Sequence, residues 1–223
     1  MKLTRFLLMM FAALSLAGCV NDDNVDGEII PVLTDIVTFE GNTDGHSHFT
    51  LVRVDDLPPV SLSGDIELNS ADLKAGQRVL MAYQPAEGQG AYQSGNITVR
   101  AVSLINNGNV EIWDRDRLEG WNDDPVYLYS IWRTGDYINL YCRLIYSTEP
   151  RRFALVASES SLETDIVNLY LVHDLPTPVN SHDRAYYASF NIADVWHRSS
   201  CKGVRVHVAN SNLDKYSFDF LKQ

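Results

Sequence analysis

Residues 126–146, VYLYSIWRTGDYINLYCRLIY, form the stretch that decides how this chain folds. Thr134-Gly135-Asp136 in its middle is a tight-turn signal, and aromatic and β-branched residues lie on both sides of it. After this turn, apolar side chains recur at every second position, at Ile138, Leu140, Cys142, Leu144 and Tyr146. A period of two is typical of a strand with one buried face. The stretch therefore predicts an antiparallel β-hairpin.

Similar short strands follow the hairpin to the end of the chain. Turn residues separate them at intervals that are typical of a β-sandwich. The expected strands, hairpin included, are Val126–Trp132, Tyr137–Tyr146, Phe153–Ala157, Ile166–His173, Ala185–Phe190, Gly203–Ala209 and Lys215–Leu221. One short helix is expected at 191–197. We therefore predict a β-sandwich over residues 125–223.

The segment before the hairpin predicts a smaller barrel over residues 29–115. Its expected strands are 29–40, 48–54, 78–84, 97–105 and 110–113, and the last two are expected to pair across Asn106-Asn107-Gly108-Asn109. A single helical turn is expected at 69–76, from Ser70 as N-cap to Gly76. Short strands with a helical turn before one of them are typical of a partly open OB-like barrel.

The predicted fold class is therefore all-β, an OB-like barrel followed by a β-sandwich. The polar segment 116–124 is the predicted linker, and Trp113 and Trp121 are expected to pack at the interface between the two halves.

The N-terminus has the layout of a secretory signal. Lys2 and Arg5 precede an apolar run that is too short to span a bilayer, and the run ends in Leu16-Ala17-Gly18-Cys19. These four residues resemble the lipobox of bacterial lipoproteins, which implies a signal peptide over residues 1–18. The same resemblance implies that the thiol of Cys19 carries a diacylglyceryl group and that its amine can be acylated, for example with palmitate. Two or three acyl chains anchor a protein stably in a membrane.

An acidic linker, residues 19–28, is expected after the anchor. Valine rather than aspartate follows Cys19, which resembles lipoproteins that are passed on to the outer membrane. The acidic residues behind it resemble an export signal for surface display, and a solvated spacer without any address is the alternative. We expect a lipid-anchored protein of the outer membrane, with surface exposure slightly favoured over a periplasm-facing position.

Charge excludes nucleic acid as a partner. The chain has 29 acidic and 18 basic residues, and removal of residues 1–18 takes away two basic ones, so the mature net charge is 16 − 29 = −13. Nucleic acids and anionic lipids both need a positive surface. Arg53, Arg78 and Arg100 are single charges on strands and are expected to face outward.

No cofactor, metal or catalytic constellation is predicted. His46 and His48 share a strand face, but zinc needs three or four ligands. His173, Asp174 and His182 with Ser181 would make a hydrolase, but no Gly-x-Ser-x-Gly elbow supports this hypothesis. After lipidation the remaining thiols are Cys142 and Cys201, for which a disulfide is allowed but disfavoured by strand parity.

One polar face is the candidate binding surface. Tyr137, Asn139, Tyr141 and Arg143 alternate with the apolar residues of the hairpin's second strand. Tyrosine, asparagine and arginine combine contact area with hydrogen bonding, as protein-binding and glycan-binding surfaces do. The alternative is that the first domain covers this face.

Several segments together resemble the NigD-like lipoproteins. They are 72–80 with the strand ending at Tyr83, 130–140, 169–174 and 188–192, in addition to the lipobox. The resemblance covers nearly the whole mature chain and implies an N-terminal OB domain followed by a β-sandwich. The family takes its name from a gene neighbourhood linked to bacteriocin production, which implies an immunity or export role. The chain departs from the family at Pro150-Arg151-Arg152, where a histidine and an aromatic residue are expected. Taken together, the sequence predicts a non-enzymatic binding or accessory protein.

Overall fold

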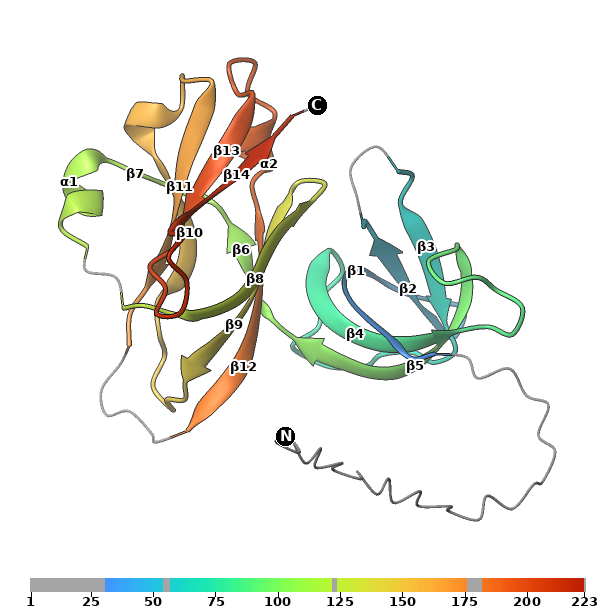
Figure 1. Ribbon diagram of the computed structural model, residues 1–223. Helices are drawn as coiled ribbons and strands as arrows, with labels where there is room; N and C mark the ends of the chain where they lie inside the picture. Colours follow the sequence, from blue (N-terminus) through green and yellow to red (C-terminus); the bar gives the residue numbers. More distant parts are fainter. Residues whose placement is uncertain (1–30, 54–56, 122–123, 176–181, 223) are drawn as a thin grey trace, which may run out of the picture.

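The computed structural model describes residues 31–53, 57–121, 124–175 and 182–222, so the predicted signal peptide and the whole predicted acidic linker, Cys19 included, lie outside the described residues. The first domain is a closed barrel with the strand order β1-β2-β3-β5-β4, and pairing of β1 with β4 closes it (Figure 1). Its strands are β1 (Leu33–Thr43), β2 (His46–Leu51), β3 (Val60–Gly64), β4 (Gln77–Pro85) and β5 (Gly95–Leu104). The predicted OB-like barrel is thus confirmed.

The barrel is filled by alternate residues of its strands. The buried set is Val37, Phe39, Phe49, Leu51, Leu62, Val79, Met81, Tyr83 and Ile97. The turn between β1 and β2 has φ values of 54° at Asp44 and 83° at Gly45. Positive φ angles at both central residues are typical of the two-residue hairpin turns whose geometry matches the twist of the strands. Aspartate and glycine are among the residues that adopt such angles most readily.

The helical turn expected at 69–76 is absent, and this prediction was wrong. The segment consists of turns, in which the backbone N–H of Leu73 donates to the Ser70 carbonyl at 3.2 Å. The N–H of Gly76 instead donates to the carbonyl of Phe39 at 2.7 Å. Bonding to a barrel strand therefore replaces the local bonds that a helix would need, and Gly76 has a φ of 83°.

The prediction of a hairpin around Asn107-Gly108 was also wrong, because the strands on either side of it do not pair with each other. β6 (Asn106–Asn109) pairs in parallel with β12 (Asp183–Asn191), and β7 (Glu111–Trp113) pairs in parallel with β10 (Phe153–Ser158). Both therefore belong to the sandwich sheets, although they lie within the range predicted for the barrel. Val110 between them packs against the sandwich core, so burial of this segment outweighs the local turn signal.

The second domain is a sandwich of two sheets, with strand orders β14-β13-β11-β10-β7 and β6-β12-β9-β8. The remaining strands are β8 (Tyr127–Thr134), β9 (Tyr137–Ile145), β11 (Ile166–His173), β13 (Gly203–His207) and β14 (Ser217–Leu221). All seven strands predicted after residue 125 are present, and the 126–146 hairpin pairs as expected. The helix predicted at 191–197 is α2 (Ala193–Trp196).

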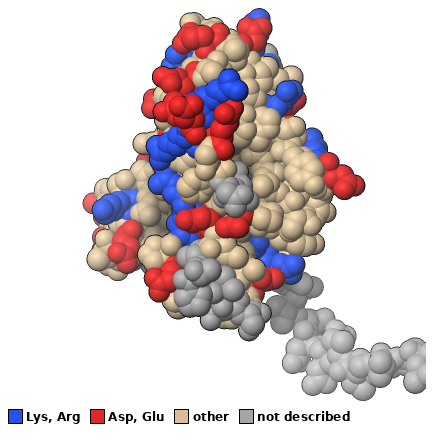
Figure 2. Space-filling view, turned by 90° about the vertical axis from the view of Figure 1, so that its left-hand side faces the viewer, with Lys and Arg blue, Asp and Glu red and all other residues tan. Residues whose placement is uncertain are grey.

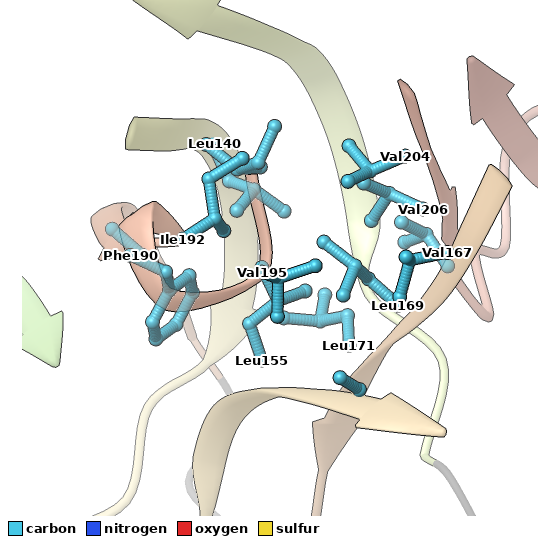
Figure 3. Close-up of a cluster of buried hydrophobic side chains, with 14 of the residues drawn as sticks. Leu140, Leu155, Val167, Leu169, Leu171, Phe190, Ile192, Val195, Val204 and Val206 are labelled. Atoms are coloured by element: carbon cyan, nitrogen blue, oxygen red, sulfur yellow. The ribbon is translucent and has the colours of Figure 1, made fainter. Parts of the chain in front are cut away.

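Inward-facing side chains of both sheets form one apolar core (Figure 3). Leu140, Leu155, Val167, Leu169, Phe190 and Val204 lie in it, and α2 adds Val195. Cys142 and Cys201 are buried in the same core and are both free thiols, so no disulfide joins them. Burial raises the pKa of the Cys142 thiol to about 12, which keeps it protonated and inert.

Trp113 and Trp121 do not lie at the interface between the domains, contrary to expectation. They meet edge to face, with ring centroids 5.5 Å apart, on the outer side of the sandwich. There they pack with Val156 and Val172 beneath Leu118 of α1 (Arg115–Glu119). The outer face of β10 and β11 is itself apolar and has to be shielded from water. The two tryptophans pack on this face and bury it.

Among the described residues, no helix is long and apolar enough to cross a membrane.

Candidate functional site

The predicted polar face of β9 is divided between the two domains. Asn139 is fully buried beneath the barrel, and the Tyr137 ring lies under the Arg78 guanidinium at 4.4 Å. Tyr141 and Arg143, further along the same strand, are only half-buried. The alternative that the first domain covers this face therefore holds for Tyr137 and Asn139, whereas Tyr141 and Arg143 remain partly accessible.

Arg78 joins the barrel to the sandwich. It lies in β4 and is 2% exposed, so the expectation that it faces solvent was wrong. Its guanidinium donates to Ser189 Oγ at 3.2 Å and Asn139 Oδ1 at 3.5 Å in the sandwich. Within the barrel it donates to Thr38 Oγ1 at 3.1 Å and the Ile36 carbonyl at 3.3 Å.

No described carboxylate pairs with Arg78, and burial lowers its pKa to about 10. A buried charge that is held only by neutral acceptors must be fully hydrogen-bonded to be tolerated. The acceptors come from both domains, so Arg78 fixes their relative position.

Beside the covered part, four tyrosines form a row that we call the tyrosine ladder, namely Tyr127, Tyr129, Tyr141 and Tyr187. The rings of Tyr129 and Tyr141 stack at 4.6 Å, and those of Tyr141 and Tyr187 stack at 4.4 Å with 8° between their planes. Tyr127 meets Tyr129 at 5.2 Å in a tilted arrangement. Tyr129 is 47% exposed, and the other three are half-buried.

Strand register builds the ladder. Tyr187 of β12 lies directly opposite Tyr141 of β9. On the other side, the register shifts between Leu128 and Ser130, so that Ser130 rather than Tyr129 becomes the partner of Tyr141. Tyr129 lies in this β-bulge, and its ring stacks on that of Tyr141 on the same face. The sequence identified Tyr141 by its alternation but not Tyr187, because the pairing of β12 with β9 is not encoded in a local pattern. Tyr129 was also not identified, although the register at the start of the hairpin already places it on this face.

Arg143 stands at the end of the ladder. Its Nε lies 3.2 Å from Asp183 Oδ2, and its guanidinium lies 4.3 Å from the centre of the Tyr127 ring. The pair is well exposed, so it adds little stability and mainly orients the arginine.

Two clefts open between the barrel and the sandwich, and Tyr187 lines both of them. The first has a volume of about 370 Å³ and brings Tyr92 and Asp35 of the barrel near Trp132 of β8. Asp35 accepts a hydrogen bond from the Tyr83 hydroxyl at 3.1 Å, and burial raises the pKa of its carboxyl. The second cleft, of about 490 Å³, lies beside the start of β12.

The residues of the hydrolase hypothesis do not form one site. The His173 ring is held by the Asp124 carbonyl at 2.9 Å and by Arg151 at 3.2 Å, whereas Asp174 accepts from the backbone N–H of Arg152. His182 stacks on Tyr146 instead, with ring centroids 4.9 Å apart. Ser181 lies outside the described residues.

The buried His173 ring predicts a loss of stability in mild acid. Burial is the main cause that lowers its pKa, and burial also lowers that of His207. The unfolded chain therefore takes up these protons first as the pH falls below about 6.5, so stability is constant above that value and decreases below it. We expect the urea concentration at the unfolding midpoint to decrease when the pH is lowered from 7.5 to 5.5. This decrease should be smaller in His173→Asn. An equal decrease in both proteins would contradict this assignment.

His46 and His48 are not joined by further metal-ligating side chains among the described residues. His46 Nδ1 lies 2.8 Å from the Gly64 carbonyl, and no group of three or more His, Cys, Asp or Glu side chains within the described ranges is placed to hold a metal ion. Figure 2 shows acidic and basic side chains beside one another on the face in view.

Comparison with known proteins gives structural neighbours only. No family model matches the sequence, and no curated protein matches it. A protein of unknown function from Bacteroides vulgatus is similar over 86% of this chain and 92% of its own, with a TM-score of 0.68 and 20% identity. A NigD-like immunity protein from Bacteroides caccae covers 85% and 91%, with a TM-score of 0.55 and 20% identity.

A putative lipoprotein from Bacteroides fragilis is similar over 86% of this chain and 96% of its own, with a TM-score of 0.57 and 13% identity. The likeness extends over nearly all of each neighbour, so barrel and sandwich occur together in all three. The resemblance to NigD-like proteins that the sequence indicated is thus confirmed at the level of the fold: this chain has the two-domain fold found in a NigD-like immunity protein.

Proposed function

We propose that this protein is a non-enzymatic binding protein, anchored by lipid on Cys19 in the outer membrane, and that its tyrosine ladder contacts a protein partner. The observation that carries the proposal is the row of stacked rings beside the interdomain clefts, in which Tyr129 is exposed and the other three rings are half-buried. Tyrosine and arginine are enriched where proteins bind each other, because they combine apolar area with hydrogen-bonding groups.

The packing of the rings favours a protein over a glycan. Tyr141 has a ring stacked on each of its faces, so its faces are covered and its edge remains for a partner. Stacking of a sugar requires an uncovered ring face. A row of edges and hydroxyls suits the peptide groups and side chains of a protein surface.

The surface is also rigid, which favours binding. Asn139, on the same strand as Tyr141, donates to Thr134 Oγ1 at 2.9 Å and accepts from Ser189 Oγ at 2.8 Å beneath the barrel. Side chains that are already ordered lose little conformational entropy when a partner binds.

The lipid anchor and the outer-membrane location rest on the lipobox at residues 16–19 and on the valine that follows Cys19. A structural neighbour described as a putative lipoprotein supports the anchor. The acidic residues behind Cys19 favour exposure at the cell surface.

Photo-crosslinking from the ladder tests the proposal. Tyr129→p-benzoylphenylalanine places the crosslinker at an exposed ladder position, and the same change at Tyr216, which is 59% exposed next to the edge strand β14, is the control. We expect discrete adducts in intact cells from position 129 that position 216 does not give, each containing an envelope or extracellular protein. Identical patterns from both positions would refute a binding role for the ladder, and an adduct that contains only saccharide would refute a protein partner.

The immunity protein among the structural neighbours supplies a second candidate, in which the partner is a bacteriocin. A strain that lacks the gene should then be more sensitive to culture supernatants of competing strains, and the wild-type gene should restore resistance. Unchanged sensitivity would exclude this candidate while leaving the crosslinking result unaffected.

A further inference from the structure

The second interdomain cleft carries a positive charge on a strongly acidic protein. We call it the arginine cleft; Leu104, Ile145, Tyr146, Arg151, Arg184 and Tyr187 are among its lining residues, and its volume is about 490 Å³. None of the aspartate and glutamate residues that the structure describes lines it, although the chain has 29 acidic residues against 18 basic ones. Cavities of a few hundred Å³ at domain interfaces are the usual places for small ligands.

The cleft exists because β6 begins only at the level of Ala188. β6 pairs with β12 only from Ala188 to Asn191, whereas β12 begins at Asp183. The edge of β12 before Ala188 therefore has no strand partner on that side. Ser103, Leu104 and Ile105, at the end of β5 and just after it, form the opposite wall.

Neither arginine of the cleft pairs with a carboxylate among the described residues. The Arg151 guanidinium contacts His173 Nε2 at 3.2 Å and donates to the Ile145 carbonyl at 2.5 Å. Arg184 is exposed, and its guanidinium lies 5.2 Å from the centre of the Tyr146 ring.

Several other arginines of the sandwich are neutralised by acids. Arg152, next to Arg151, is paired with Glu111 at 2.5 Å, and Arg205 is paired with Asp219 at 2.6 Å. The arginines of the cleft therefore keep a positive charge of the kind that nearby acids neutralise at Arg152 and Arg205.

The remaining lining is suited to a ligand that is only partly polar. Leu104 is 49% exposed and Ile145 is 37% exposed, so both offer apolar contact. Ser103, Ser147 and Asn106 add hydroxyl and amide groups. The Tyr146 ring lies beneath Arg184, which holds the guanidinium over the wall of the cleft.

We infer that the arginine cleft binds a small anionic ligand, about the size of one or two sugar rings, through a carboxylate or phosphate group held by Arg151 and Arg184. Guanidinium groups bind both oxyanions through charge-assisted hydrogen bonds. This inference goes beyond the proposed function and does not depend on it, because Tyr129, from which the partner is probed, does not line the cleft.

Calorimetric titration of the mature chain with three probes tests the inference. The probes are digalacturonate for the carboxylate, glucose 1-phosphate for the phosphate, and neutral maltose. We expect one or both anionic probes to bind and maltose not to bind, and we expect 0.5 M NaCl to weaken the binding. Binding of only one anionic probe identifies which anion the cleft takes.

Substitutions decide whether binding occurs in this cleft. Arg184→Met changes an exposed side chain and should weaken binding at least about tenfold, as should Arg151→Lys, because an ammonium cannot reproduce the planar donor geometry. Arg100→Met, at an exposed arginine of β5 whose guanidinium donates to Gln84, is the matched control and should bind normally. The inference is overturned if neither anionic probe binds, if maltose binds equally well, or if Arg184→Met binds as the wild type does. Because photo-crosslinking from Tyr129 is measured separately, failure here is distinguishable from failure of the proposed function.

Discussion

Arg78→Met should lower the free energy of unfolding by about 3 kcal/mol. Methionine fills a similar volume but removes the donors that serve Ser189, Asn139, Thr38 and the Ile36 carbonyl. Four hydrogen bonds to a charged donor contribute at least about 6 kcal/mol together. The lowering of the Arg78 pKa from 12.5 to about 10 shows that burial of the charge opposes this by about 3 kcal/mol, which the substitution relieves. The hydrogen bonds outweigh the burial cost.

Denaturant unfolding measures this effect, with Arg100→Met as the control, because Arg100 is exposed and bonds only Gln84. The control should remain within about 0.5 kcal/mol of the wild type. Since Arg78 joins the two domains, we also expect the single unfolding transition to broaden or separate into two in Arg78→Met. A stability equal to that of the wild type, with one sharp transition, would mean that Arg78 does not hold the domains together.

Trp113→Ala should destabilise the sandwich by about 4 kcal/mol. The side chain is 1% exposed and packs against Val156 and Val172. Its indole N–H also donates to Glu111 Oε2 at 3.0 Å, and the Arg117 guanidinium lies 3.7 Å from the ring centre. Truncation leaves a large cavity beneath α1, and the cover over β10 and β11 is lost.

Thermal and denaturant unfolding test this prediction. Ile112→Ala is the matched control, because Ile112 is the neighbouring residue of β7 and is 52% exposed. It should change stability by less than about 0.5 kcal/mol. A similar small change in Trp113→Ala would contradict the assignment of Trp113 to a buried cluster.

Features with a local period were predictable from the sequence. Alternation of apolar residues located the strands of the sandwich, including the hairpin from Tyr127 to Ile145. The same alternation placed Tyr137, Asn139, Tyr141 and Arg143 on one face of β9. Side-chain period and turn chemistry act over a few residues, so a single sequence contains them.

Features that depend on distant partners were not predictable. Asn107-Gly108 reads as a hairpin turn, yet β6 and β7 pair with strands that lie more than 40 residues later. Arg78 reads as an ordinary polar strand residue, because the docking of a second domain decides whether it meets solvent. The tyrosine ladder needs the pairing of β12 with β9, which brings Tyr187 opposite Tyr141, and this pairing is not visible in β9 alone.

The two domains act together in this account. The barrel covers Asn139 and leaves Tyr141 uncovered, so the position that Arg78 fixes determines how much of the polar face a partner can reach. The same docking forms the arginine cleft at the other side of Tyr187. The proposed binding surface and the cleft are therefore both consequences of one interdomain contact.

The most direct test of the central claim, that the protein is lipid-anchored and presents its binding surface outside the cell, is protease treatment of intact cells. The chain carries an epitope tag after Gln223, and a Cys19→Ala variant is fractionated in parallel. We predict that the tag is lost from intact cells while a periplasmic control protein stays whole, and that Cys19→Ala leaves the membrane fraction. A tag that survives until the outer membrane is permeabilised, or a variant that remains in the membrane fraction, would contradict the account.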